Sequence, residues 1–243
     1  SSDVCSSDLP QYNNDRAKLQ ADYPILVHPM DKTDNYIKRC VGIPGDVIEI
    51  KKSQLWVNSA PALVTPFMQT EYLVETDGRP LAEEFIQDTL GININEATAD
   101  FQFVEGRPNT FKLNITAGAA ASLKRLPNVK SVVLFEDQNV GYTFPNDIVH
   151  FPWTADNFGP IRIPKKGDQV LLNDSTIEMY RRIIEGYEHQ KLTVQNGQYF
   201  INDKAANTYT FQQNYYWMMG DNRHRSQDSR YWGFVPETHI VGR

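Results

Sequence analysis

The chain has 243 residues, with 24 lysines and arginines against 30 aspartates and glutamates, and a formal net charge of -6. This length allows one large domain or two modest ones, and the acidic balance argues against nucleic-acid binding, which needs clustered cations. No apolar run approaches the ~18 residues that a membrane-spanning helix requires, so we expect any membrane anchor to lie outside these residues. Two cysteines, Cys5 and Cys40, cannot build a disulfide framework.

Residues 1–9 read SSDVCSSDL, a near-duplication that we interpret as a cloning or sequencing scar. The first regular segment spans residues 36–58, where Val47 to Ile50 and Leu55 to Val57 have the composition of two hairpin strands. The Pro44-Gly45-Asp46 step before them predicts a turn, because proline fixes φ and glycine tolerates positive φ. We therefore predict a β scaffold in this region.

The pattern changes in the next hundred residues. From residue 67 to residue 135, strand-like and helix-like segments follow the order strand, helix, strand, strand, helix, strand. The first helix is expected from Pro80 to just before Gly91, and the second from a Thr116 cap to Leu126. This order predicts an α+β subdomain inserted at residues 61–150, of the ferredoxin-like βαββαβ type.

The chain then returns to β-type patterns. Residues 153–166 are rich in Pro, Gly and Asn and are predicted to form a loop. Ser175 and Glu178 fit a capping box at the start of a third helix, and Asn196-Gly197 favours a type I′ hairpin. We therefore expect a β core made of residues 10–60 and 151–243, interrupted by the insertion.

Two segments give the strongest functional signal: YIKRCVGIPGD at residues 36–46 and WMMGDNRHRSQDSRYWGFVPETHIVGR at residues 217–243. In this order they resemble the two C-terminal sequence boxes of bacterial type I signal peptidases. The second match is long and keeps its register from Gly220 to Val235. The resemblance implies a mainly β fold, with a signal-peptidase-like antiparallel β catalytic core around the large α+β insertion.

In that family the lysine of the Tyr-Ile-Lys-Arg stretch is the general base, and the resemblance assigns this role to Lys38. A solvated lysine is almost entirely protonated at neutral pH, so this chemistry requires an amine held among apolar groups. Taken alone, Lys38 would be interpreted as a surface lysine. Ser226 matches the family serine whose hydroxyl orients the lysine amine, and the plainer alternative is a loop serine with a local contact.

The charged residues around these positions resemble the family's buried polar supports. Asp221 is expected to pair with Arg39, and Asp228 with Arg230 or Arg223. Their implied role is structural rather than chemical. Without the resemblance, a segment this charged would be interpreted as a solvated face whose ion pairs contribute little.

The resemblance also implies substrates and a location. The substrates would be signal peptides of exported preproteins, cut after small residues in an Ala-x-Ala-like pattern. Tyr36 and Ile37 match positions that line the shallow substrate pockets, and core packing is an equal alternative. The location would be the bacterial cytoplasmic membrane, with the catalytic domain on its outer, periplasmic side. Tyr231, Trp232 and Phe234 are expected either to meet the membrane interface or to be core residues.

The family's nucleophile lies upstream of the lysine in a Ser-Met-x-Pro motif, which these 243 residues do not contain. Ser7 is followed by Asp8-Leu9-Pro10, so it has the proline spacing but no methionine, and it is a poor candidate. We expect both ends of the chain to be truncated. A lysine base without a nucleophile or oxyanion donors has nothing to activate. We therefore predict that these residues alone are inactive and that the intact protein cleaves signal peptides.

Two other functions stay open. Ser-Lys dyads also occur in self-cleaving repressor-type proteases, which would need a DNA-binding or partner module. A non-catalytic peptide-binding or scaffold protein derived from a peptidase would explain a genuine loss of the serine, and the upstream gene sequence distinguishes these cases. No metal or other cofactor is predicted, because the histidines lack ligand spacing and are expected mostly at the surface. They are His28, His150, His189, His224 and His239.

Overall fold

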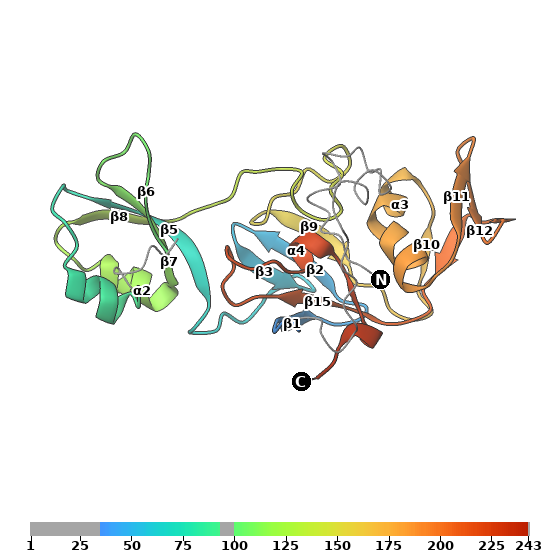
Figure 1. The fold of residues 1–243 in the computed structure, drawn as a ribbon, viewed down its shortest axis with the longest axis horizontal. Coiled ribbons are helices and arrows are strands. Elements are labelled where there is room, and N and C mark those ends of the chain that lie inside the picture. The colour runs from blue at the N-terminus through green and yellow to red at the C-terminus, as the bar shows by residue number, and fades with distance from the viewer. Residues whose placement is uncertain (1–34, 93–99, 243) are drawn as a thin grey trace, which may run out of the picture. The chain divides into compact units, whose positions relative to one another are not determined.

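The computed structural model describes residues 35–92 and 100–242. Regular structure in these ranges is mainly antiparallel β, which confirms the predicted fold class (Figure 1). From Lys38 onward the described residues form one compact unit, and residues 35–37 lie outside it. Within the described ranges, none of the helices has the length and apolar character needed to cross a membrane.

The first sheet of the core contains the predicted hairpin. Alternate side chains of its two strands face inward, so Ile48, Ile50 and Leu55 are buried while their neighbours reach the surface. The sheet order is β4-β3-β2-β9. These strands are β2 (Val47–Lys51), β3 (Gln54–Val57), β4 (Ala60–Pro61) and β9 (Phe158–Arg162).

Strand β9 lies within residues 153–166, so the prediction of a loop there was wrong. Its glycine and proline gave it a weak local strand signal. It forms a strand because it pairs with β2 and buries Phe158 and Ile161 in the core. Packing against a neighbouring strand overrides local propensity here.

A second sheet brings the two motif segments together. It has the order β1-β15-β16, with β1 at Arg39–Gly42, β15 at Tyr215–Met219 and β16 at Val235–Pro236. Tyr215, Trp217 and Met219 alternate along the central strand, and all three are almost fully buried. The apolar positions of the second motif therefore anchor it to the core.

Helix α3 begins earlier than the sequence predicted. The Asn173 side chain accepts a hydrogen bond from the Thr176 amide at 2.9 Å, and the Thr176 hydroxyl accepts one from the Asn173 amide at 2.9 Å. This is a capping box, so the assignment to Ser175 and Glu178 was wrong by two residues. Asparagine accepts the amide bond as readily as serine does, and Ile177 of this helix faces the core.

The rest of the core consists of short elements. The predicted hairpin turn is present, because Asn196 and Gly197 both have positive φ between β11 and β12. These elements are β10 (Gln169–Leu171), α3 (Asp174–Arg181), the π-helical η4 (Arg182–Tyr187), β11 (Leu192–Gln195), β12 (Gln198–Ile201), β13 (Lys204–Ala205), β14 (Thr208–Thr210), α4 (Ser229–Trp232) and the 3-10 turn η5 (Glu237–His239).

The intervening segment forms its own four-stranded antiparallel sheet with the order β6-β7-β5-β8. Numbered along the segment, this order is 2-3-1-4, the arrangement of the predicted βαββαβ unit. Its elements are β5 (Gln69–Thr76), the π-helical η3 (Phe85–Thr89), β6 (Phe101–Phe103), β7 (Thr110–Thr116), α2 (Ala117–Leu123) and β8 (Val129–Leu134). The domain boundaries at 61 and 150 stay a prediction.

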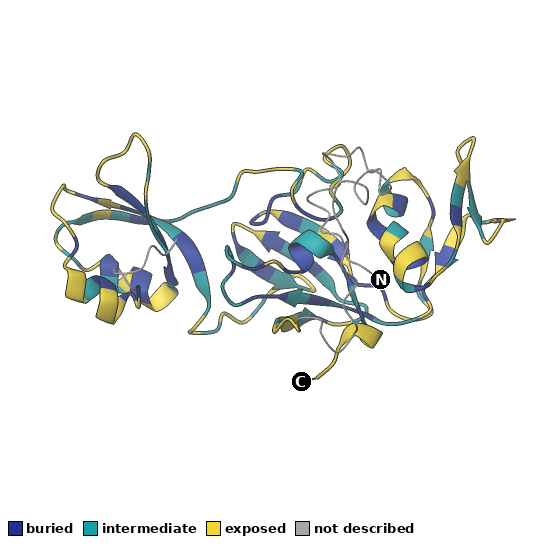
Figure 2. Ribbon diagram, in the orientation of Figure 1, coloured by how far each residue is buried: buried dark blue, intermediate teal, exposed yellow. Residues whose placement is uncertain are grey.

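This sheet has a hydrophobic core of its own (Figure 2). Val74, Leu113 and Ile115 from the strands pack with Leu123 from α2 and Ile86 from η3. The Thr116 hydroxyl accepts a hydrogen bond from the Ala119 amide, as expected for the predicted cap, and α2 ends three residues before Leu126. The other predicted helix begins at Glu83, three residues after Pro80.

Phe234 belongs to the main core. It is 3% exposed and packs against Trp217, Tyr180 and Phe144. The expectation that it contributes to a membrane-facing aromatic surface was therefore wrong, because its ring is enclosed by other aromatic rings. The alternative of core packing holds for this residue.

Gly159 offers a test of how closely β9 packs against β2. An added Cβ would lie 2.8 Å from the Ile48 carbonyl oxygen, and φ is +87°. We predict that Gly159→Ala lowers the free energy of unfolding by about 1–3 kcal/mol more than Gly167→Ala does. Gly167 is the matched control, since it has φ +86° but open space around its Cα. Equal losses in urea unfolding would contradict the close packing.

Candidate functional site

Antiparallel pairing of β1 and β15 joins the two motifs. Arg39 lies opposite Met219, and Cys40 lies opposite Met218. Extending this register by one residue places Lys38 opposite Gly220. Lys38 is partly exposed and lies at the end of the ladder, where the second motif leaves its strand.

The ion pair between Arg39 and Asp221 links the two motifs a second time. Its two hydrogen bonds join Nε to Oδ1 at 2.8 Å and Nη2 to Oδ2 at 2.7 Å. The Arg39 hydrogen bond and charge hold the pKa of Asp221 below its usual range. The two side chains are 49% and 36% exposed, so the expectation of a buried pair was wrong. Both reach solvent beside a cavity of about 240 Å³ that Leu55 and Leu63 also line.

Asp228 and Arg230 form the buried counterpart of this pair. Arg230 Nε and Nη2 donate to the two carboxylate oxygens of Asp228, each at 2.9 Å, and the two side chains are 1% and 0% exposed. Burial alone would lower the pKa of Arg230, but the hydrogen bonds and charge of Asp228 outweigh it and raise the pKa. Arg230 therefore keeps its charge inside the protein.

Further hydrogen bonds tie this pair to the surrounding chain. The Gly220 amide donates to Asp228 Oδ2 at 3.1 Å, and the Met218 amide donates to the Ser229 hydroxyl at 2.9 Å. Arg230 Nη2 also donates to the Arg223 carbonyl. The end of β15, the following loop and α4 are thus held by one polar cluster.

Arg223 is buried beside this cluster. Desolvation, and then the positive charge of Arg230, lower its pKa to about 10. Asp228 and Asp221 offset part of this shift through their charges. The backbone carbonyl of Arg223 supports the loop. Its guanidinium, by contrast, is desolvated and lies near the positive charge of Arg230, both of which disfavour its charged form.

Ser226 lies in the loop that this cluster encloses. Its hydroxyl is buried and has no hydrogen-bond partner among the described residues. A Cβ added to Gly220 would come within 3.0 Å of both the Cβ and the Oγ of Ser226, so the serine packs directly on the glycine backbone. Since the strand register directs Lys38 to Gly220 as well, the three residues belong to one region.

Other predicted site residues are less clearly placed. Tyr36 and Ile37 are 70% and 96% exposed and lie outside the compact unit, so their role as pocket residues stays a prediction. Ser7 and the rest of residues 1–9 lie outside the described residues. Within the described ranges, no three His, Cys, Asp or Glu side chains gather as metal ligands would.

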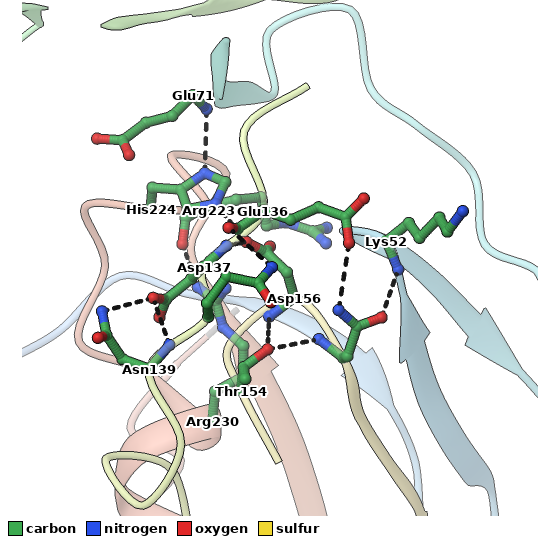
Figure 3. A network of polar contacts seen from close by, with 12 residues as sticks. Lys52, Glu71, Glu136, Asp137, Asn139, Thr154, Asp156, Arg223, His224 and Arg230 are labelled. Atoms are coloured by element: carbon green, nitrogen blue, oxygen red, sulfur yellow. Dashed lines mark hydrogen bonds and ion pairs between the residues drawn. The ribbon is translucent and has the colours of Figure 1, made fainter. Parts of the chain in front are cut away.

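His224 lies in a polar network that its sequence pattern did not predict (Figure 3). The His224 side chain is only 6% exposed, so the expectation of a surface histidine was wrong. It lies between the Glu71 amide, at 3.0 Å from Nδ1, and the Asp156 carboxylate, at 2.8 Å from Nε2. The only sequence signal for this burial was its position two residues before Ser226.

Asp156 is almost fully buried in this network. Desolvation by burial acts to raise its pKa. The hydrogen bond from His224, together with the hydrogen bond from the Asp137 amide, outweighs that effect, so the pKa lies below its usual range. The low pKa of this buried carboxylate therefore depends on its hydrogen bond with His224.

Comparison with known proteins identifies the relatives of this chain. The family model described as signal peptidase, peptidase S26, matches residues 12–122 and 158–243. Signal peptidase I of Buchnera aphidicola subsp. Acyrthosiphon pisum is 27% identical over 224 residues, which cover 92% of this chain and 52% of that protein. Signal peptidase I of Haemophilus influenzae is 34% identical over 90 residues, 34% of this chain and 20% of that protein. This chain spans about half the length of that protein and of the signal peptidase I from Buchnera aphidicola subsp. Baizongia pistaciae.

The buried ion pair between Asp228 and Arg230 is expected to contribute to the stability of the fold. Replacing Asp228 with Asn leaves Arg230 charged and unpaired in the interior, so we expect the free energy of unfolding to fall by about 3–5 kcal/mol. Asp203→Asn is the control, because the ion pair of Asp203 with Lys191 is exposed and should leave stability nearly unchanged. Urea unfolding measures both variants, and similar losses would rule out a special role for Asp228.

Proposed function

This chain belongs to the signal peptidase family, peptidase S26, and from that membership we propose that it supplies the general base and its supporting framework to a membrane-anchored serine endopeptidase. The enzyme removes signal peptides from exported preproteins. The observation that carries the proposal is the β1–β15 register, which directs Lys38 to the glycine that packs on Ser226.

In this mechanism the Lys38 amine removes the proton from a serine hydroxyl as the oxygen attacks the scissile carbonyl. The ammonium then gives that proton to the departing amine, which leaves an acyl-enzyme. Lys38 next activates the water that hydrolyses the acyl-enzyme. The nucleophile belongs to the family's Ser-Met-x-Pro motif, which these 243 residues do not contain. The chain without that motif is inactive.

The Ser226 hydroxyl forms a hydrogen bond with the Lys38 amine. This bond fixes the direction in which the amine points. Its hydroxyl is suited to this role because it is buried and has no other hydrogen-bond partner among the described residues. The Asp228–Arg230 pair and the Arg39–Asp221 pair support the site by holding both motifs in place. Preorganisation of this kind reduces the entropy cost of reaching the transition state.

Substrate choice in this proposal depends on shallow apolar pockets beside the catalytic lysine. Tyr36 and Ile37 line those pockets and admit small residues, giving cleavage after Ala-x-Ala-like sequences. The catalytic domain faces the outer, periplasmic side of the bacterial cytoplasmic membrane. Tyr231 and Trp232, which are partly exposed, can contact the interface there.

A non-catalytic peptide-binding protein derived from a peptidase is the second candidate. The two candidates differ in one observable property. The peptidase cleaves a preprotein at one bond, whereas the scaffold binds a signal peptide and leaves it intact. Sequencing the gene upstream of residue 10 shows whether the motif is encoded.

Lys38→Met is the direct test of the proposed base. We predict that the gene product carrying this sequence cleaves a preprotein in detergent, and that Lys38→Met lowers kcat at least 1,000-fold, on the order expected for loss of a catalytic base together with its nucleophile activation. Lys51→Met is the control, because Lys51 is exposed and pairs with Glu49 away from both motifs. Equal cleavage by the wild type and Lys38→Met would end the proposal.

Gly220→Ala tests whether close packing positions Ser226. The added methyl group must displace the Ser226 side chain, so we expect kcat to fall by about 10- to 100-fold while KM changes little. Gly186→Ala is the control, since its new Cβ would meet nothing closer than 3.7 Å. Unchanged kcat in a folded Gly220→Ala protein would show that the position of Ser226 is not critical.

A further inference from the structure

The loop from Asp221 to Ser226 is hydrogen-bonded to the first strand of the inserted sheet. The Gln69 amide donates to the Asp221 carbonyl at 2.9 Å, and the Arg223 amide donates to the Gln69 carbonyl at 2.8 Å. These two bonds form a parallel bridge between Gln69 and Asn222, whose side chains also hydrogen-bond at 3.1 Å. The start of β5 therefore acts as a partner strand for the loop.

His224 extends this connection along β5 from Gln69 to Glu71. Its Nδ1 accepts a hydrogen bond from the Glu71 amide, and a ring nitrogen can accept only when it carries no proton. The ring proton of the neutral histidine is therefore on Nε2, which donates to Asp156. The ring thus bridges the β5 backbone and a buried carboxylate on the segment that leads into β9.

Arg225, the residue immediately before Ser226, makes the third connection. Its guanidinium lies 3.5 Å from Glu71 Oε1 and 3.2 Å from Asp100 Oδ1. Lys112 from β7 approaches the other Glu71 oxygen at 3.0 Å. Three successive loop residues before Ser226 are therefore bonded to the inserted sheet through backbone, imidazole and guanidinium groups.

These contacts add to those of the Asp228–Arg230 cluster. That cluster holds the loop at Gly220 and at the Arg223 carbonyl. The position of Ser226 thus depends on two supports, one from the core and one from the insertion.

We infer that His224 is a positioning residue, which holds the Ser226 loop against the inserted sheet through the Glu71 amide. This inference rests on the proposed function, because it gives the insertion a role in aligning the serine that orients Lys38. His224 contacts no reacting atom in this scheme. It acts through the placement of Ser226.

A double-mutant cycle tests this inference in the intact gene product. His224→Ala should lower kcat by about 10- to 100-fold and change KM less than about threefold. In a Ser226→Ala background, where no hydroxyl remains to be positioned, the same substitution should lower kcat less than about threefold. An equal factor in both backgrounds would overturn the inference, because it would show a merely structural effect.

Two conservative variants keep the test valid if His224→Ala does not fold. Asn places an acceptor near the position of Nδ1 and so keeps the Glu71 bond, whereas Gln places a donor near Nε2 and keeps the Asp156 bond. We expect His224→Asn to retain more kcat than His224→Gln at similar melting temperatures. The opposite order would place the support at Asp156 and overturn the role of the inserted strand.

Controls separate failure of this inference from failure of the proposed function. Lys38→Met is measured in the same assay, and activity that does not depend on Lys38 would refute the proposed function itself. Lys38-dependent activity combined with an unaffected His224→Ala would refute only the positioning role. His150→Ala is the matched histidine control, since His150 is exposed and pairs with Asp147 outside the network, and it should leave kcat and KM unchanged.

Discussion

The site region depends on the buried ion pair between Asp228 and Arg230. One carboxylate accepts hydrogen bonds from the Arg230 guanidinium, from the Gly220 amide at the end of β15 and from the Arg230 amide at the start of α4. It thereby fixes a strand end and a helix start at once. A buried pair has a large desolvation cost, which these extra hydrogen bonds help to offset. Its value here is that it determines one geometry for the chain around Ser226.

Strand pairing explains how two motifs that are far apart in sequence come together. Arg39 begins the edge strand β1, and Lys38 directly precedes it. Strand β15 is the partner of β1, and Trp217 and Met219 anchor it in the core. The exposed Arg39–Asp221 pair adds a small further restraint at the surface. The order of the motifs in the chain is therefore less important than their antiparallel pairing.

The inserted sheet contributes more than bulk to this arrangement. Its β5 strand pairs with the loop at Asn222, and its Glu71 contacts both His224 and Arg225. A subdomain with a separate hydrophobic core is thus joined to the loop around Ser226 by a few hydrogen bonds. Such coupling requires only that the loop has different stability with and without its partner strand.

The sequence by itself determined the elements whose signals are local. The hairpin turn at Asn196-Gly197 and the Thr116 cap follow from short-range chemistry, and the strand and helix order of the insertion follows from hydrophobic periodicity. The two motifs also indicated the family and its expected catalytic lysine. Local patterns were enough here because each of these features is fixed by residues within a few positions of one another.

Only the tertiary structure decided the features that depend on distant partners. Strand β9 forms because β2 is beside it, and His224 is buried because the Glu71 amide and Asp156 enclose its ring. Nothing within a few residues of His224 supplies those partners. Whether a polar side chain is buried depends on which groups from elsewhere in the chain can satisfy its hydrogen bonds, and that information appears only when the chain is folded.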